Sequence, residues 1–192
     1  MGFNWVDIVM AVIILKGMHS VQKSIFVTEV YHFIGAALAT FITLHYYVGF
    51  GHYLHKSFSV PESVQSFTAF CLLGGGIIFF FFVSQGGWKA LLSVTMPNFL
   101  EHWGCLVLAA LRNFMYAGLA FLALTMFDNG LFARETQGSF GSRIFQNMSI
   151  ATYSFMHQNI VQPLFKHERF NDQVYHIIAP PRKTPVAVKK EE

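Results

Sequence analysis

The stretch NWVDIVMAVIIL, residues 4 to 15, is apolar almost throughout, yet it has one acidic side chain, Asp7, near its start. A carboxylate is very costly to bury among Ile, Val and Met side chains, so it must find a partner, take up a proton or meet water. The stretch therefore predicts a helix in an apolar environment and a polar partner for Asp7.

The composition of the whole chain agrees with a membrane environment. Of its 192 residues, 54% are hydrophobic and only 12% are charged, about half the charged share of an ordinary soluble domain. This composition favours an integral membrane protein with one small domain. Most Lys and Arg residues lie toward the carboxyl end, but they are scattered and lack interleaved aromatic residues, so we expect no nucleic-acid partner.

Apolar runs predict an all-α protein with four transmembrane helices, because each run is long enough to cross a bilayer. We place these helices at residues 4–21, 25–47, 64–83 and 103–127. A polar loop is expected over 49–63. An interfacial or re-entrant segment is expected within 84–102, where Pro97 ends an apolar run too short to span.

The composition changes after the fourth predicted span. Apolar side chains recur at roughly helical intervals between Ser142 and Phe165, which predicts an amphipathic helix that lies on the membrane or caps the bundle. The last residues are rich in Pro and charge, which is typical of disorder. The expected domains are 1–130 for the four-span membrane domain, 131–178 for a linker and the amphipathic tail helix, and 179–192 for a disordered basic tail.

Small residues predict where helices approach one another. Gly35, Ala39 and Thr43 follow at four-residue spacing in the second span, and such a strip lets another membrane helix come close. We expect this face to recognise spans of a partner. In the third span, the triplet Gly74, Gly75 and Gly76 permits close approach, a kink or a local break.

Three charged residues lie inside the predicted spans: Asp7, Glu29 and Arg112. Intramembrane charges are expensive and usually face one another or a wet path. One hypothesis is that Arg112 meets Asp7 or Glu29 and forms part of an ion or proton route. The alternative is a structural ion pair that fixes helix register, or a group that reaches the nearer membrane surface.

No pattern in the sequence indicates catalysis or a cofactor. His52 and His55 have helical metal-ligand spacing, but no Cys or acidic residue completes a ligand set, so they are weak metal candidates and we expect neither metal nor cofactor. There is no nucleophile elbow, phosphate-binding loop or dinucleotide fingerprint, and we expect no enzyme activity.

With the spans placed, the chain resembles the colicin V production protein (CvpA) family of small bacterial inner-membrane proteins. Its opening NWVDI, residues 4–8, is similar to the N-W-[IV]-D-[IV] start of that family, and Glu29 falls where the family has an acid early in its second span. The stretch Gly104 to Gly118, especially Ala109 to Arg112, resembles the G-A-x-R-G turn of that family into its last span. The resemblance covers roughly residues 3–165.

The chain also departs from the family pattern: Ser24-Ile25 stand where the family usually has Arg-Gly, and Asn113 stands where it has Gly after the Arg. The resemblance implies a multi-pass protein of the bacterial inner membrane. It implies a non-enzymatic envelope scaffold or accessory subunit of a membrane complex, linked to colicin V production and export, with lipids and a membrane protein as partners. The alternative is a small homo-oligomeric ion or proton channel or transport component that uses Asp7, Glu29 and Arg112.

Overall fold

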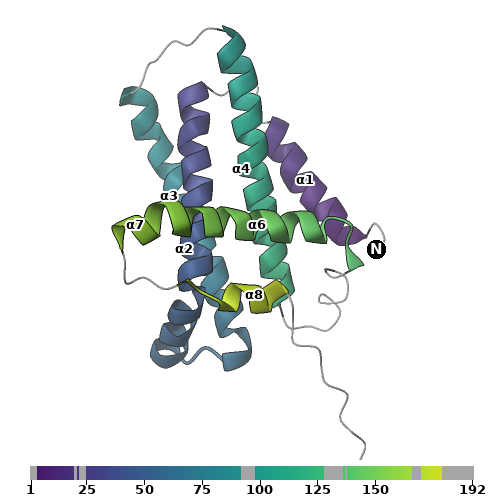
Figure 1. Cartoon of the computed structure of the whole chain (residues 1–192), viewed down its shortest axis with the longest axis vertical. Coiled ribbons are helices and arrows are strands. Elements are labelled where there is room, and N and C mark those ends of the chain that lie inside the picture. Colours follow the sequence, from purple (N-terminus) through teal and green to yellow (C-terminus); the bar gives the residue numbers. More distant parts are fainter. Residues whose placement is uncertain are drawn as a thin grey trace, which may run out of the picture.

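The computed structural model of the chain describes residues 4–19, 21, 25–91, 98–127, 136, 138–165 and 170–178. The regular structure of these residues is helical, as predicted (Figure 1). The elements are α1 (Trp5–His19), α2 (Phe26–Phe58), α3 (Glu62–Leu91), α4 (Asn98–Met126), α6 (Ser142–Met156), the π-helical turn η2 (His157–Val161), α7 (Gln162–Leu164) and α8 (Gln173–Ile178).

Three helices are long and apolar enough to cross a membrane: Phe26–Phe58, Val64–Gly87 and Glu101–Met126. They correspond to the second, third and fourth predicted spans, and they make the chain a multi-pass membrane protein. The first predicted span is represented by α1, which has 15 residues. At 1.5 Å per residue α1 is about 22 Å long, short of the ~30 Å hydrocarbon core of a bilayer.

The long helices run side by side along the long axis of the molecule, and α6 lies across them (Figure 1). Helix α2 packs against α3 on one side and α4 on the other, and α1 packs against α4. Helix α6 contacts both α4 and α2. It therefore ties the tail to the bundle.

The loop predicted over 49–63 is wrong for most of its length, because α2 continues to Phe58 and α3 begins at Glu62. One face of this extension stays packed: Leu54 is buried, and Gly51 lies against the backbone of Gln65. The apolar contact with α3 thus keeps α2 helical although its other face is polar. The turn is confined to residues 59–61, with Ser59 in the left-handed conformation at a φ of 54°.

Residues 84–91, the start of the segment predicted as interfacial or re-entrant, continue α3 to Leu91 and do not form a separate helix; their interfacial position stays a prediction. The Ser84 hydroxyl donates to the carbonyl of Phe80, one turn earlier in the same helix, and the glycines after it do not interrupt the helix. Helix α4 begins at Asn98, so residues 98–102 are helical too. Residues 92–97 lie outside the described part of the chain.

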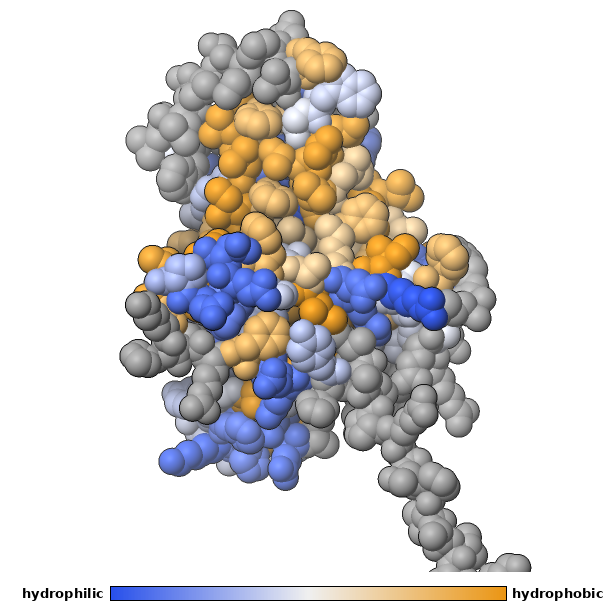
Figure 2. Space-filling model, in the orientation of Figure 1, coloured by the Kyte–Doolittle hydropathy of each residue, from blue (hydrophilic) through white to orange (hydrophobic). Residues whose placement is uncertain are grey.

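The predicted amphipathic helix is confirmed, and α6, η2 and α7 follow one another from Ser142 to Leu164. One face of α6 is buried at helical spacing through Phe145, Ser149 and Tyr153. Figure 2 shows apolar surface on one side of this helix, and hydrophilic surface along it and beyond it toward the α2–α3 turn. The predicted disordered tail, 179–192, lies outside the described residues.

The largest hydrophobic core lies where α6 crosses the bundle. It joins residues of α2, α3, α4, α6 and α8: Ala39, Phe41, Leu44, Tyr47, Phe70, Leu119, Leu122, Tyr153, Met156 and Val174. Val174 belongs to α8, a helix that the sequence pattern did not predict, and it is fully buried. The amphipathic helix and the segment after it are therefore packed into the same core as the spans.

The small-residue strip of α2 packs against α3 of the same chain. Phe81 covers Gly35, where an added Cβ would lie 2.6 Å from its ring, and Thr43 Oγ1 would be 3.2 Å from a Cβ on Gly74. Ala39 is fully buried between them. The expectation that this strip recognises a partner is therefore corrected, because α3 already covers it.

The three glycines of the triplet in α3 lie on two different faces of the helix: Gly74 faces α2, and Gly75 and Gly76 face outward. Gly74 packs on α2, as close approach predicts, whereas a Cβ on Gly75 or Gly76 would meet nothing within 4 Å. Helix α3 is continuous through the triplet, so the glycines neither break nor end it.

Candidate functional site

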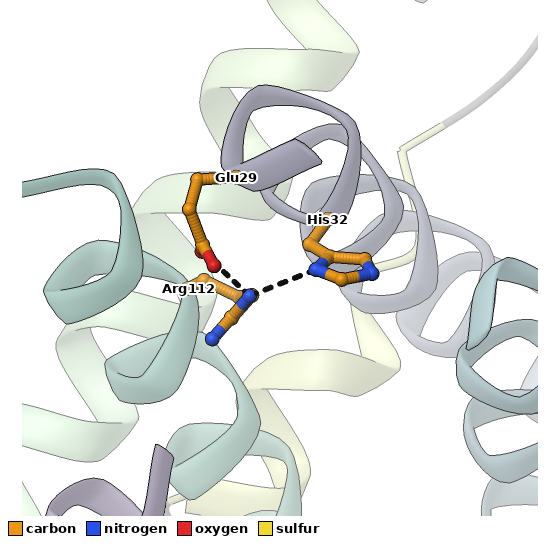
Figure 3. Close-up of polar contacts among 3 residues, drawn as sticks. All are labelled: Glu29, His32 and Arg112. Atoms are coloured by element: carbon orange, nitrogen blue, oxygen red, sulfur yellow. Dashed lines mark hydrogen bonds and ion pairs between the residues drawn. The ribbon is translucent and has the colours of Figure 1, made fainter. Parts of the chain in front are cut away.

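Glu29 and Arg112 form an ion pair between α2 and α4 (Figure 3). Arg112 Nη1 donates to Glu29 Oε2 at 2.6 Å, and their side chains are only 7% and 1% exposed. The sequence left open which acid Arg112 would meet, and the structure places it on Glu29. Along α4, Arg112 is six residues from Gly118, about 9 Å, and Gly118 is where α6 packs.

His32 completes the cluster from the next turn of α2. Its Nδ1 lies 3.1 Å from the same Arg112 Nη1 (Figure 3). Because a guanidinium can only donate hydrogen bonds, His32 Nδ1 must accept, and the ring is then neutral with its proton on Nε2. His32 was not among the predicted site residues. The signal that finds it is its spacing of three residues from Glu29, which puts both on one helix face.

The cluster is electrically balanced: one carboxylate faces one guanidinium beside a neutral imidazole. Such a buried pair adds little net stability, because desolvation offsets attraction, but removing one partner leaves an uncompensated charge and costs about 3–5 kcal/mol. Arg112 is nevertheless not fully satisfied, because its Nε has no acceptor among the described residues. A cavity of about 200 Å³ adjoins it, lined also by His32 and Tyr116.

Asp7 lies apart from this cluster and binds the segment that leads into α6. Its Oδ1 accepts from Ser139 Oγ at 2.5 Å and from the Gly141 amide at 2.9 Å, and its Oδ2 accepts from the Phe140 amide at 3.2 Å. The hypothesis that Asp7 pairs with Arg112 is therefore not realised. Asp7 instead connects α1 to the tail across the sequence.

Asp7 also caps its own helix. The Asn4 side chain accepts from the amides of Val6 and Asp7 at 3.0 and 3.4 Å, while Asp7 Oδ2 accepts from the Asn4 amide at 3.1 Å. This reciprocal arrangement is a capping box.

The two histidines considered for metal binding lie on the exposed end of α2. His52 and His55 are both exposed, and the Nδ1 of His55 is 2.7 Å from the carbonyl oxygen of Val60 in the turn. Within the described residues, no group of three or more His, Cys, Asp or Glu side chains is placed to hold a metal ion.

A second polar junction, which the sequence did not indicate, joins α2, α6 and the segment before α8. Tyr153 Oη lies 3.0 Å from His45 Nδ1 and accepts from the Asn171 amide at 2.9 Å. The Asn171 side-chain amide donates to the carbonyl of Leu44 at 2.8 Å. These contacts hold the segment 170–178 on the bundle. Only His45, a polar residue within an apolar run, was a visible signal.

The fold and this geometry define a class of protein: an α-helical multi-pass membrane protein with a buried ion pair between two of its long helices and an amphipathic helix that lies across them. A scan against models of known families gives no match, and comparisons with curated proteins and with solved structures give none either.

Proposed function

We propose that the protein is a non-enzymatic scaffold or accessory subunit of a complex in the bacterial inner membrane, as the resemblance to the colicin V production family implies. The observation that carries the proposal is the uncovered outer face of α3. Only 17% of the apolar 18-residue stretch of α3 is buried within the chain, whereas 44% of the corresponding stretch of α2 and 56% of that of α4 are buried.

The exposed face of α3 combines small and aromatic residues. Gly75 and Gly76 have open space around them, and Phe79, Phe80 and Phe82 are each more than 60% exposed. In lipid, small residues let a second helix approach closely and gain dispersion contacts, which drive helix association there. We assign the partner-binding role to this face, in place of the strip that begins at Gly35.

The proposal includes α1 as a fourth membrane-inserted helix. Its outward residues Ile8, Val12 and Leu15 are more than half exposed, and all are apolar. Helix α1 starts beside residues 139–141 at the level of α6 and ends near the start of α2 (Figure 1). Since α2 crosses the membrane in the opposite direction, α1 must return across it. Its shortness is accommodated by local thinning of the bilayer.

The second candidate is a homo-oligomeric ion or proton channel. The observation that favours it is the cavity beside His32 and Arg112, which places ionisable groups next to open space in the bundle. Against it, Asp7 is held by the tail and the pair is neutralised internally. A route would therefore need a second copy of the chain to supply further polar residues.

Gentle extraction from native membranes, followed by mass analysis of the intact particle, separates the two candidates. A stoichiometric foreign subunit is expected, and Gly75→Leu should release it because the side chain blocks close approach. Gly49→Leu is the matched control, since Gly49 also has open space around it but lies outside the proposed interface. A particle containing copies of this chain alone would overturn the scaffold proposal and favour the channel.

A further inference from the structure

A groove lies in the angle between α2 and α6, and neither the proposed partner-binding face of α3 nor the buried ion pair uses it. Its volume is about 480 Å³, within the range of about 300–1,000 Å³ that is usual for ligand pockets. Met115 and Met156 belong to its wall and are buried, whereas Ile34, Phe155 and Ile160 belong to its wall and are exposed. The groove therefore has a buried floor and an exposed, apolar rim.

The wall of this groove has little to offer a polar ligand. Among the described residues that line it, only Thr152 has a polar side chain, and its hydroxyl donates to the carbonyl of Met148, one turn earlier in α6. A non-helical peptide segment would bury N–H and C=O groups there without partners, and a charged group would lose its hydration. The groove therefore suits an occupant made of hydrocarbon.

The groove lies on the apolar side of α6. Helix α6 crosses α2 where Tyr153 stacks on Phe41 and its Oη lies 3.0 Å from Nδ1 of His45. The groove residues of α2, from Phe33 to Leu38, precede this crossing, whereas the hydrophilic end of the α2–α3 hairpin follows it. Figure 2 shows apolar surface on the side of α6 where the groove lies. With α6 at the membrane surface, as its amphipathic pattern predicts, the exposed rim lies at the depth of the acyl chains.

A helix of a partner protein fits this place less well than an acyl chain does. One helical turn with its side chains is about 10–12 Å wide and 5.4 Å high and takes up about 500 Å³, so the groove holds no more than one turn. A membrane helix that ran along α2 would also collide with α6, which lies across α2 (Figure 1). An acyl chain whose headgroup lies at the level of α6 begins there and extends along α2 toward the bilayer centre. The chain's own residues 179–192 are rich in Lys, Arg and Glu, which an apolar groove would strip of water.

We propose that this groove binds one acyl chain of a membrane phospholipid. The acyl chain lies along α2 from Leu38 toward Phe33, on the floor that Met115 and Met156 form. It fills the angle between the crossing helices and supplies van der Waals contacts that α2 and α6 cannot make with each other there. The proposal concerns a lipid partner and does not depend on the scaffold role.

Native mass spectrometry of the full chain, released from nanodiscs of palmitoyl-oleoyl phosphatidylcholine, tests the proposal. As the collision energy is raised, loosely associated lipids leave first, and one phosphatidylcholine per chain is expected to remain. Ala151→Phe fills the groove from α6, and Ala37→Phe fills it from α2, so each should lose this last lipid. Ala151 is exposed, so its replacement does not require the bundle to repack. Ala11→Phe is the matched control, because Ala11 is exposed on α1 and lies outside the groove.

Three results of this measurement would overturn the proposal: loss of every lipid from the wild type, retention of the last lipid in Ala151→Phe, or its loss in the Ala11→Phe control. A photocrosslinker at the rim then identifies the occupant in native membranes. With p-benzoylphenylalanine in place of Phe155, irradiation should give an adduct with the mass of one phospholipid. An adduct with a foreign protein or with a second copy of this chain would assign the groove to a helix and overturn the proposal.

Discussion

At the scale of single residues, Glu29 and Arg112 show why a charged side chain inside a membrane protein needs a partner. Either charge alone would be very costly to place in lipid, and in the pair both side chains are almost completely buried. The pair fixes the register of α2 against α4, because a shift of either helix by one residue would separate the charges. Asp7 has a comparable role between α1 and the tail, through amides and a hydroxyl in place of a cation.

Arg112→Leu should destabilise the protein by about 3–5 kcal/mol, because it leaves Glu29 buried without a counter-charge. The double variant Glu29→Leu, Arg112→Leu should recover most of this loss, since no charge then remains. Thermal unfolding in detergent measures both, with Lys56→Leu as a control at an exposed cation. Equal stability of wild type and Arg112→Leu would contradict the requirement for the buried pair.

Asp7 holds the tail on α1 through hydrogen bonds from Ser139, Phe140 and Gly141. Asp7→Asn should therefore lower the free energy of unfolding by about 2 kcal/mol, the scale of hydrogen bonds to a charged group. Thermal unfolding in detergent measures this loss. Equal stability of wild type and Asp7→Asn would refute this assignment.

At the scale of elements, glycines decide which helix faces can meet. Gly35→Leu should destabilise the α2–α3 pair by about 1–3 kcal/mol, because the added side chain must displace the ring of Phe81. Gly76→Leu, the same substitution at a position with open space, should leave the free energy of unfolding nearly unchanged. If the two variants unfold alike, the packing of α3 on this strip is wrong.

The attachment of α6 to α4 depends on Gly118. A Cβ there would lie 3.2 Å from the carbonyl oxygen of Phe145 and would contact the Ser149 side chain. Gly118→Leu should therefore lift α6 from the bundle while the spans remain paired. Limited proteolysis should then cut within 142–165 much faster than in wild type. Equal protection of that segment in both proteins would argue against docking at this position.

At the scale of the whole molecule, α6 defines a plane across the bundle, and the elements on either side of it differ. Apolar helix surface lies on one side, and the hydrophilic end of the α2–α3 hairpin lies on the other (Figure 2). From this asymmetry we expect α6 to lie at a membrane surface, where an amphipathic helix keeps its apolar face in the acyl region.

The proposed topology, in which α1 is a fourth span, predicts the sidedness of three positions. In a background with Cys71 and Cys105 replaced by Ser, a cysteine at Arg143 and an amino-terminal epitope tag should be accessible on one side of the membrane. A cysteine at His19 should be labelled from the other side, because α1 lies between it and the tag. Impermeant reagents on intact cells and inverted vesicles report this. A tag and His19 on the same side would exclude α1 as a span.

Local patterns determined much of this protein. Apolar length predicted the long helices, and the 3.6-residue period predicted α6, because both depend only on neighbouring residues. The cost of burying charge predicted partners for Asp7, Glu29 and Arg112. The resemblance of residues 3–165 to a known family remains a prediction, as do the function and the partners that it implies.

Only the tertiary structure decided which groups meet. Arg112 pairs with an acid 83 residues away in the sequence, and Asp7 binds a hydroxyl 132 residues away. Contacts between residues so far apart depend on how whole helices pack together, and no local sequence pattern contains that information. For the same reason the small-residue strip met α3 of its own chain, and α2 remained helical beyond its apolar run. The sequence determined which residues needed a partner, because the cost of burying a charge depends on the residue and its neighbours along the chain. The packing of the helices determined the partner, because it brings residues from distant parts of the chain together.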